Sequence, residues 1–127
     1  MKLSEAILLG SVSTGQAFYI LEDPQGNTCA KGSALKAMGL CTSNDKGYQF
    51  ANDTWPFLRE LEATICPECN CSVEQRTYNG DITKLIPHLN DIHKWTRPRI
   101  AAHVATLEPQ DEQVTNTIIE EIYHEVK

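Results

Sequence analysis

Two cysteines and two histidines in this sequence have the spacing of ligands for a single metal ion. Cys66 and Cys69 are separated by two residues, and after a gap of 18 residues His88 and His93 follow, separated by four. Structural zinc sites commonly combine two thiolates with two imidazoles in a tetrahedron, and their histidines lie three to five residues apart. The sequence therefore predicts one structural Zn²⁺ ion. The gap is longer than the usual 12–15 residues, so a ββα finger is not implied.

The histidine pair places a condition on the element that carries it. Residues five apart on an ideal α-helix are separated by roughly 140° around the axis. His88 and His93 therefore reach one ion only if the helix loosens, and we expect this near His93, just before Trp95. Proline is tolerated in a first helical turn but not in a helix interior. We expect a helix that begins near Thr83 or later, with Pro87 in its first turn.

Other ligand sets stay open at the level of sequence. Cys71 follows closely enough to join the two cysteines of the predicted site, with one histidine as the fourth ligand. His103 is a further candidate, although a histidine on an amphipathic helix is most often a surface residue. Cys29 and Cys41 are expected to be small buried apolar groups.

Two kinds of enzyme are alternatives to a structural site. The motif Cys-Pro-Glu-Cys resembles a thiol–disulfide motif, but such motifs belong to a βαβ unit, which this sequence does not suggest. A catalytic zinc keeps an open position for water, whereas four good ligands fill the coordination sphere. The nearby acids are Glu68 and Asp91, and we expect Asp91 to orient a ligand histidine or to cap a turn. We therefore predict that the protein is not an enzyme.

The composition bounds the class of protein. The chain has 127 residues, enough for one domain, with 11 basic and 17 acidic side chains and a net charge of −6. An acidic balance argues against general binding to phosphate backbones. No apolar run approaches the ~20 residues of a membrane span, and Glu5 interrupts the start of an apolar signal region. An odd count of five cysteines does not suggest a disulfide framework. These features predict a cytoplasmic protein without a membrane partner.

The remaining pattern predicts a mainly α fold with one small β-hairpin. Helices are expected at 3–9 and 33–39, and a third is expected to run from residue 53 or 54 to residue 65. The aromatic and β-branched segment 17–21 is typical of a strand, with 48–50 as a possible second strand. Residues 66–80 are expected to form a loop, with room for one short strand pair. We expect a zinc-stabilised domain over 1–108 and an acidic amphipathic helix over 109–127.

A helix-turn-helix-like pair is expected around residues 94–96. Thr96 is a suitable N-cap for a helix over 97–107. Its exposed side is expected to carry Arg97, Arg99 and His103. Residues 81–104 hold four basic and two acidic side chains, a net charge of 4 − 2 = +2. Arg97, Arg99 and His103 could contact nucleic acid or a partner, or simply form a solvated helix face.

The motif His-Leu-Asn-Asp-Ile-His-Lys-Trp at 88–95 resembles a small family of uncharacterised bacterial and phage proteins. The similarity covers roughly residues 2–107 and includes Lys-Leu-Ser-Glu-Ala-Ile at 2–7, Cys-Ala-Lys-Gly-Ser-Ala-Leu at 29–35 and Cys-Pro-Glu-Cys at 66–69. Pro87 and Pro98 depart from the pattern of that family, in which better helix formers are expected at these positions. The resemblance implies a bacterial or phage origin and supports the four ligands as a unit, but it implies no activity.

These observations lead to one functional expectation and one alternative. The leading expectation is a small zinc-binding accessory protein that binds another protein, such as a host factor or a virion component, in a bacterial cell or a virion. Self-association through the C-terminal helix is part of this expectation. The alternative is a small DNA-binding regulator that uses the helix over 97–107.

Overall fold

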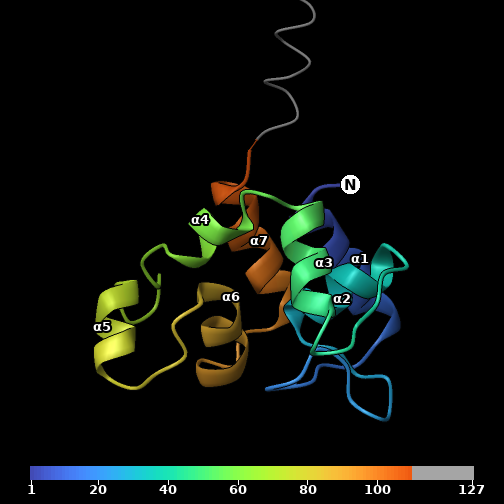
Figure 1. The fold of residues 1–127 in the computed structure, drawn as a ribbon, viewed down its shortest axis with the longest axis horizontal. Coiled ribbons are helices and arrows are strands. Elements are labelled where there is room, and N and C mark those ends of the chain that lie inside the picture. Colours follow the sequence, from blue (N-terminus) through green and yellow to red (C-terminus); the bar gives the residue numbers. More distant parts are fainter. Residues whose placement is uncertain (110–127) are drawn as a thin grey trace, which may run out of the picture.

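In the computed structural model, which describes residues 1–109, short helices joined by loops build the fold (Figure 1). Their bounds are α1 Leu3–Ser13, α2 Ala30–Ala37, α3 Gly47–Thr54, α4 Leu58–Glu62, α5 Val73–Tyr78, α6 Leu85–Pro87, the π-helix η1 His88–Ile92, and α7 Arg97–Leu107. The predicted mainly α class is confirmed. The predicted C-terminal helix lies almost entirely outside the described residues.

The core forms where α1 packs against α2 and α7. Leu3 and Ile7 of α1, Leu35 of α2 and Ile100 of α7 are fully buried together. Gly10 allows the close approach of α1 to α2, because a Cβ atom at this position would lie 1.9 Å from the Ser33 carbonyl oxygen. The predicted helices at 3–9 and 33–39 are thus confirmed, each starting or ending within a few residues of the predicted bounds.

The predicted β-hairpin is wrong for the part of the chain that the structure describes. Residues 48–50 lie within α3, and the segment around residues 17–21 makes only isolated bridges to Thr28. Thr28 pairs with Gln16 on one side and with Glu22 on the other, so no two segments run side by side in register. Tyr19 has a φ of 65°, which turns the chain sharply inside the expected strand.

The predicted helix over 53–65 is also wrong as a single element. It is broken between the end of α3 at Thr54 and the start of α4 at Leu58. Pro56 explains the break, because a residue before proline is pushed out of helical conformation, and Trp55 has φ −124° and ψ 82°. The predicted loop over 66–80 contains α5 rather than a strand pair, and α5 starts with a capping box formed by Ser72 and Gln75.

Arg97, at the start of α7, is buried rather than exposed as predicted. Its Nη1 donates to hydroxyl oxygens of Thr14 at 2.7 Å, Thr28 at 3.1 Å and Ser33 at 3.0 Å. Its Nη2 donates to the carbonyls of Thr14 and Ser11 at 2.6 and 3.3 Å. Burying a guanidinium is unfavourable unless acceptors surround it. Here they come from the end of α1, the following loop and α2, which the sequence does not place beside residue 97.

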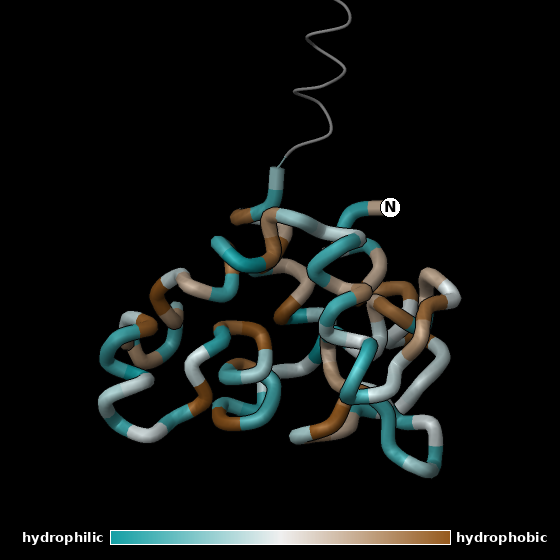
Figure 2. Tube along the Cα trace, viewed as in Figure 1, coloured by the Kyte–Doolittle hydropathy of each residue, from teal (hydrophilic) through white to brown (hydrophobic). Residues whose placement is uncertain are grey.

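Apolar stretches along the trace are short and interrupted by hydrophilic residues (Figure 2). Within residues 1–109, none of the helices has the length and apolar character needed to cross a membrane.

Candidate metal centre

The structure brings the four predicted ligands together. One ligand atom each from Cys66, Cys69, His88 and His93 lies within 4.8 Å of all the others, so the group could hold a metal ion. The cysteines follow α4, whereas His88 begins η1 and His93 comes directly after it. Cys66 and His88 are buried, His93 is half-buried and Cys69 is exposed. The site therefore lies at the edge of the core and joins two separate stretches of chain.

A π-helix resolves the geometric conflict between the two histidines. The backbone N–H of His93 donates to the carbonyl of His88 at 3.2 Å, which is the i to i+5 bond of a π-turn. The wider turn places both rings on one side, with their Nε2 atoms 3.0 Å apart and their planes at 84°. The predicted distortion is confirmed, although it begins at His88 rather than near His93. Pro87 lies in the first turn of α6, as expected.

The two cysteines belong to a tight turn whose backbone faces the sulfur atoms. Cys66 donates its N–H to the Cys71 carbonyl at 3.0 Å, and Asn70 donates to the Cys66 carbonyl at 2.9 Å. Asn70 has a φ of 61°, a conformation that asparagine tolerates better than most residues. Arg76 closes the turn from α5 by donating from Nη1 to the Cys71 carbonyl at 2.7 Å.

The thiols of this turn differ in acidity. At Cys69 burial works to raise the pKa, but hydrogen bonds from the Cys71 backbone and from the His93 and His88 side chains outweigh it and lower the pKa to about 6. At Cys66 burial dominates and raises the pKa, despite backbone hydrogen bonds from Cys69 and Glu68. A thiolate is the form that binds metal. Cys69 therefore reaches the metal-binding thiolate form more easily than Cys66, whose burial opposes ionisation.

Glu68 orients one ligand histidine. Its Oε2 lies 2.9 Å from His93 Nδ1 and also accepts a hydrogen bond from Trp95 Nε1 at 2.8 Å. A proton on Nδ1 leaves the Nε2 lone pair of His93 free for a metal. His88 Nδ1 is 3.4 Å from Asp81 Oδ2, a contact with ion-pair distance but without hydrogen-bond geometry.

Of the two roles expected for Asp91, orienting a ligand histidine is wrong, whereas holding a turn agrees with the structure. Its Oδ1 accepts from the Tyr19 N–H at 3.0 Å and from Asn90 Nδ2 at 2.6 Å, so it binds the chain around residue 19 instead of a ligand histidine. Glu68 and Asp81 lie beside the histidines in its place. The position of Glu68 between two ligands offered a signal in the sequence, but the approach of Asp81 depends on the fold alone.

The remaining sequence candidates lie outside this group of ligands. Cys71 and His103 are not among the four side chains whose ligand atoms converge. Cys29 is half-buried, but Cys41 is exposed and contacts the Ser43 hydroxyl, so the prediction that it is buried is wrong. His103 is half-buried against Trp95, and the exposed Arg99 places its guanidinium carbon 3.7 Å from the centre of the Trp95 ring.

Comparisons with protein-family models, with curated proteins and with solved structures give no match to this chain. The resemblance of residues 2–107 to bacterial and phage proteins therefore stays a prediction.

Proposed function

We propose that this chain is a small binding protein with one structural Zn²⁺ ion, and that it acts by contact with another protein rather than by catalysis. The observation that carries the proposal is the convergence of two cysteine sulfurs and two histidine nitrogens within 4.8 Å. This ligand set is typical of structural zinc.

The distances between the ligand atoms support zinc. Bond lengths of 2.0–2.1 Å to nitrogen and 2.3 Å to sulfur give tetrahedron edges of about 3.3 Å between two nitrogens and about 3.6 Å between nitrogen and sulfur. The two histidine Nε2 atoms are 3.0 Å apart, and Cys69 Sγ lies 3.5 Å from His88 Nε2. All four ligand atoms lie within 4.8 Å of one another, so small side-chain rotations can bring any wider pair to such an edge.

A structural role follows from the ligand count. Four protein ligands leave no position for a water molecule, which a hydrolytic zinc requires. Bound zinc supplies positive charge that stabilises two thiolates and links the turn after α4 to η1. Such sites contribute to folding directly, by about 10–16 kcal/mol in zinc-finger peptides.

The metal also positions an exposed group that we call the aromatic face, formed by Phe18, Tyr19 and Lys94. The Lys94 ammonium lies 4.4 Å from the centre of the Phe18 ring and 5.9 Å from that of Tyr19. Asp91 connects this face to η1, because it accepts from the Tyr19 N–H through its carboxylate and from Lys94 Nζ through its carbonyl at 3.2 Å. Closing the metal site thus fixes the helix that holds the face.

Two residues of the aromatic face have backbone conformations that are unfavourable for residues other than glycine, which is common at binding sites. Tyr19 and Lys94 have φ values of 65° and 53°, although neither is glycine. Each such residue costs on the order of 1 kcal/mol and persists only where its surroundings impose it, often at binding sites. Phe18 and Tyr19 are 39% and 64% exposed. Burial of their rings therefore offsets little of the cost of the unfavourable backbone conformation.

A protein is the partner that this face suits best. Exposed aromatic rings are typical of the centres of protein interfaces. A nucleic acid is less suited, because the chain carries a net charge of −6 and Arg97 is buried away from any phosphate. In line with the resemblance, we propose a bacterial host factor or a virion component as the partner.

The test compares two exposed tyrosines. The Tyr19→Ala variant should lose partners that the zinc-loaded wild type captures from a bacterial lysate, whereas the matched control Tyr78→Ala should retain them. Tyr78 is 92% exposed on α5, away from the aromatic face. Equal loss in both variants, or no loss in either, would contradict the proposed face.

A second measurement separates the regulator from the protein-binding role. Salt-sensitive retention of the wild type on DNA or heparin, lost in Arg99→Ala and Lys94→Ala, would favour the regulator. The present proposal expects no retention at physiological salt.

A further inference from the structure

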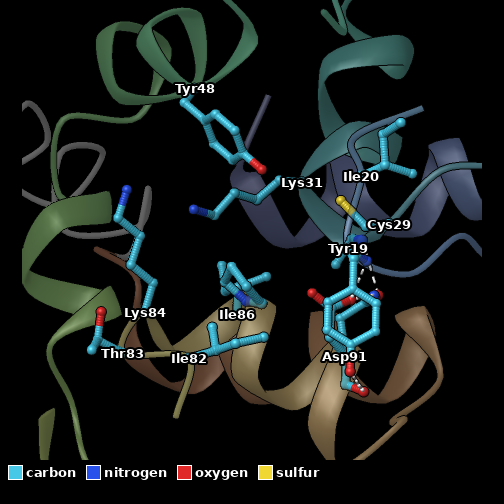
Figure 3. Close-up of a pocket in the computed structure, with 13 residues that line it drawn as sticks. Tyr19, Ile20, Cys29, Lys31, Tyr48, Ile82, Thr83, Lys84, Ile86 and Asp91 are labelled. Carbon is cyan, nitrogen blue, oxygen red and sulfur yellow. Dashed lines mark hydrogen bonds between the residues drawn. The ribbon is translucent and has the colours of Figure 1, made fainter. Parts of the chain in front are cut away.

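A cavity of about 330 Å³ lies on the side of η1 that faces α2 and α3 (Figure 3). Tyr48 enters it from α3 and Lys31 from α2, while residues 82–84 form the opposite wall ahead of α6. Its volume is at the small end of the range of ligand pockets, about 300–1,000 Å³. Tyr19 of the aromatic face lies at one side of it, but none of the four predicted metal ligands lines it.

Two lysine ammonium groups approach the same aromatic ring at this cavity, and one of them is paired with a carboxylate. Lys31 and Lys84 place Nζ 5.3 Å and 5.6 Å from the centre of the Tyr48 ring. The Lys31 side chain is only 4% exposed and contacts Glu62 Oε2 at 2.5 Å. An ammonium group has three N–H donors, so this one contact leaves donor capacity at Lys31. Lys84 makes no ion pair within residues 1–109.

The carboxylate of Glu62 is already in use. Its Oε1 accepts from the Ile86 N–H at 2.7 Å, and its Oε2 pairs with Lys31. The second positive charge, on Lys84, therefore has no counterpart at this end of the cavity. A buried ammonium group with spare donors beside a second, unpaired ammonium group favours the binding of an anionic ligand.

The other donors at this end point to the same kind of ligand. The Tyr48 hydroxyl and the Thr83 hydroxyl form no side-chain hydrogen bond with any described residue, and both line the cavity. A neighbouring hollow shares Lys31, Thr83 and Lys84 and adds the exposed guanidinium of Arg59. Cations and hydroxyls thus gather on an otherwise acidic protein.

The rest of the lining combines apolar side chains with one carboxylate. Ile20, Ile82, Ile86 and Pro87 supply the apolar part. Asp91 lies beside Tyr19 (Figure 3), and its Oδ1 already accepts from the Tyr19 N–H and from Asn90 Nδ2. We propose that the cavity binds a small organic anion, with a carboxylate or phosphate group at Lys31 and Lys84 and a short apolar or aromatic body against the isoleucines. Recognition combines charge at one end with apolar burial at the other.

An NMR titration that follows the amide signals of the zinc-loaded protein tests this with three probes of similar size. Benzoate and phenyl phosphate carry the two anionic heads, and benzyl alcohol is the neutral control. The proposal expects at least one anion to bind more tightly than the alcohol, with amide shifts centred on Tyr48, Lys84 and Ile86. The tighter anion identifies the head group.

A matched pair of variants tests the role of charge. Lys84→Gln should weaken the anion about two- to fivefold, the range expected for one solvent-accessible charge pair, and Lys46→Gln should not. Both lysines are exposed, so neither change should disturb the fold. Absence of binding by both anions, equal binding of the alcohol, or equal loss in the two variants would overturn the proposal.

Discussion

At the scale of residues, Glu68 connects the metal site to the core. One oxygen of its carboxylate contacts both the His93 ring and the Trp95 indole, at 2.9 and 2.8 Å. Trp95 is almost fully buried, so the carboxylate is held on one side by the core while it orients a ligand on the other. Glu68 lies between the two cysteines and therefore moves with them. This arrangement favours a single ring orientation before the metal arrives.

Replacing Glu68 with glutamine should weaken zinc binding by about 10- to 100-fold, since partners that hold a metal-binding histidine contribute at this level. A competition titration against a chelator of known affinity measures the change. Glu60→Gln, which removes the same charge from an exposed position in α4, is the control and should bind zinc like the wild type. Equal affinity of both variants would show that Glu68 does not orient His93.

Two arginines at the start of α7 have different roles. Arg97→Met should lower the free energy of unfolding by about 2–4 kcal/mol, because several buried hydroxyls and carbonyls lose a charged donor. Arg99→Met removes only an exposed stack on Trp95 and should cost about 0.5–1 kcal/mol. Chemical denaturation of both zinc-loaded variants gives the comparison. Similar costs for the two would be inconsistent with the hydrogen-bonding role of Arg97.

At the scale of elements, the pairing of α1 with α2 depends on Gly10. The Ser33 backbone occupies the space that a side chain would need, and backbone yields less readily than a flexible side chain. The Cys29 side chain caps α2 just below this contact by accepting from the Gly32 N–H. Gly10 therefore sets how closely the two helices pack.

Gly10→Ala should destabilise the protein by about 1–3 kcal/mol or more, the usual cost of overpacking. In an exposed helix the same change would be stabilising, because alanine is the better helix former. Ser13→Ala at the exposed end of α1 provides the control and should change stability little. Thermal unfolding followed by circular dichroism distinguishes the two. A Gly10→Ala protein as stable as the wild type would contradict the close contact.

The elements also show what sequence patterns can predict. Helices with a cap or a regular apolar face were predictable, as with α1 and with α7 behind Thr96. The five-residue histidine spacing predicted a distorted helix, because only one geometry satisfies it. The prediction of a hairpin was wrong because residues 17–21 have the composition of a strand but no neighbouring strand to pair with. Hydrogen bonds and bridges to Thr28 determine the path of this segment instead.

At the scale of the whole molecule, α5 and the turn after α4 are tied to the core by few groups. In Figure 1, α5 lies at the opposite end of the molecule from α1 and α2. Arg76 is its only buried residue, and donates to carbonyls of Cys71, Thr83 and Thr64. The hydrogen bond from Trp95 to Glu68 is a second connection, and the proposed zinc ion would be a third. The core of α1, α2 and α7 needs none of these.

Removal of zinc should therefore loosen one part of the molecule more than the other. We expect chelation to raise hydrogen exchange in α5 and η1 strongly, and in α1 and α2 much less, because apolar burial holds the latter pair. Exchange measured by mass spectrometry on the loaded and stripped protein tests this. A uniform increase across all helices would mean that the ion supports the entire fold.

The four ligand residues of the candidate metal site were predictable from the sequence. The residues that surround them were not. Cys66, Cys69, His88 and His93 follow a spacing that few other roles require. The burial of Arg97, the approach of Asp81 to His88 and the cavity at Lys31 arise from chain segments that meet only in three dimensions. No local pattern in the sequence brings these segments together.

The most direct test of the central claim is the zinc content of the purified full-length protein, measured by elemental analysis. We predict one zinc ion per chain in the wild type and in Cys71→Ser, and strongly reduced zinc in Cys69→Ser and His93→Ala. A wild type without stoichiometric zinc, or a Cys69→Ser protein that keeps it, would contradict the proposed site.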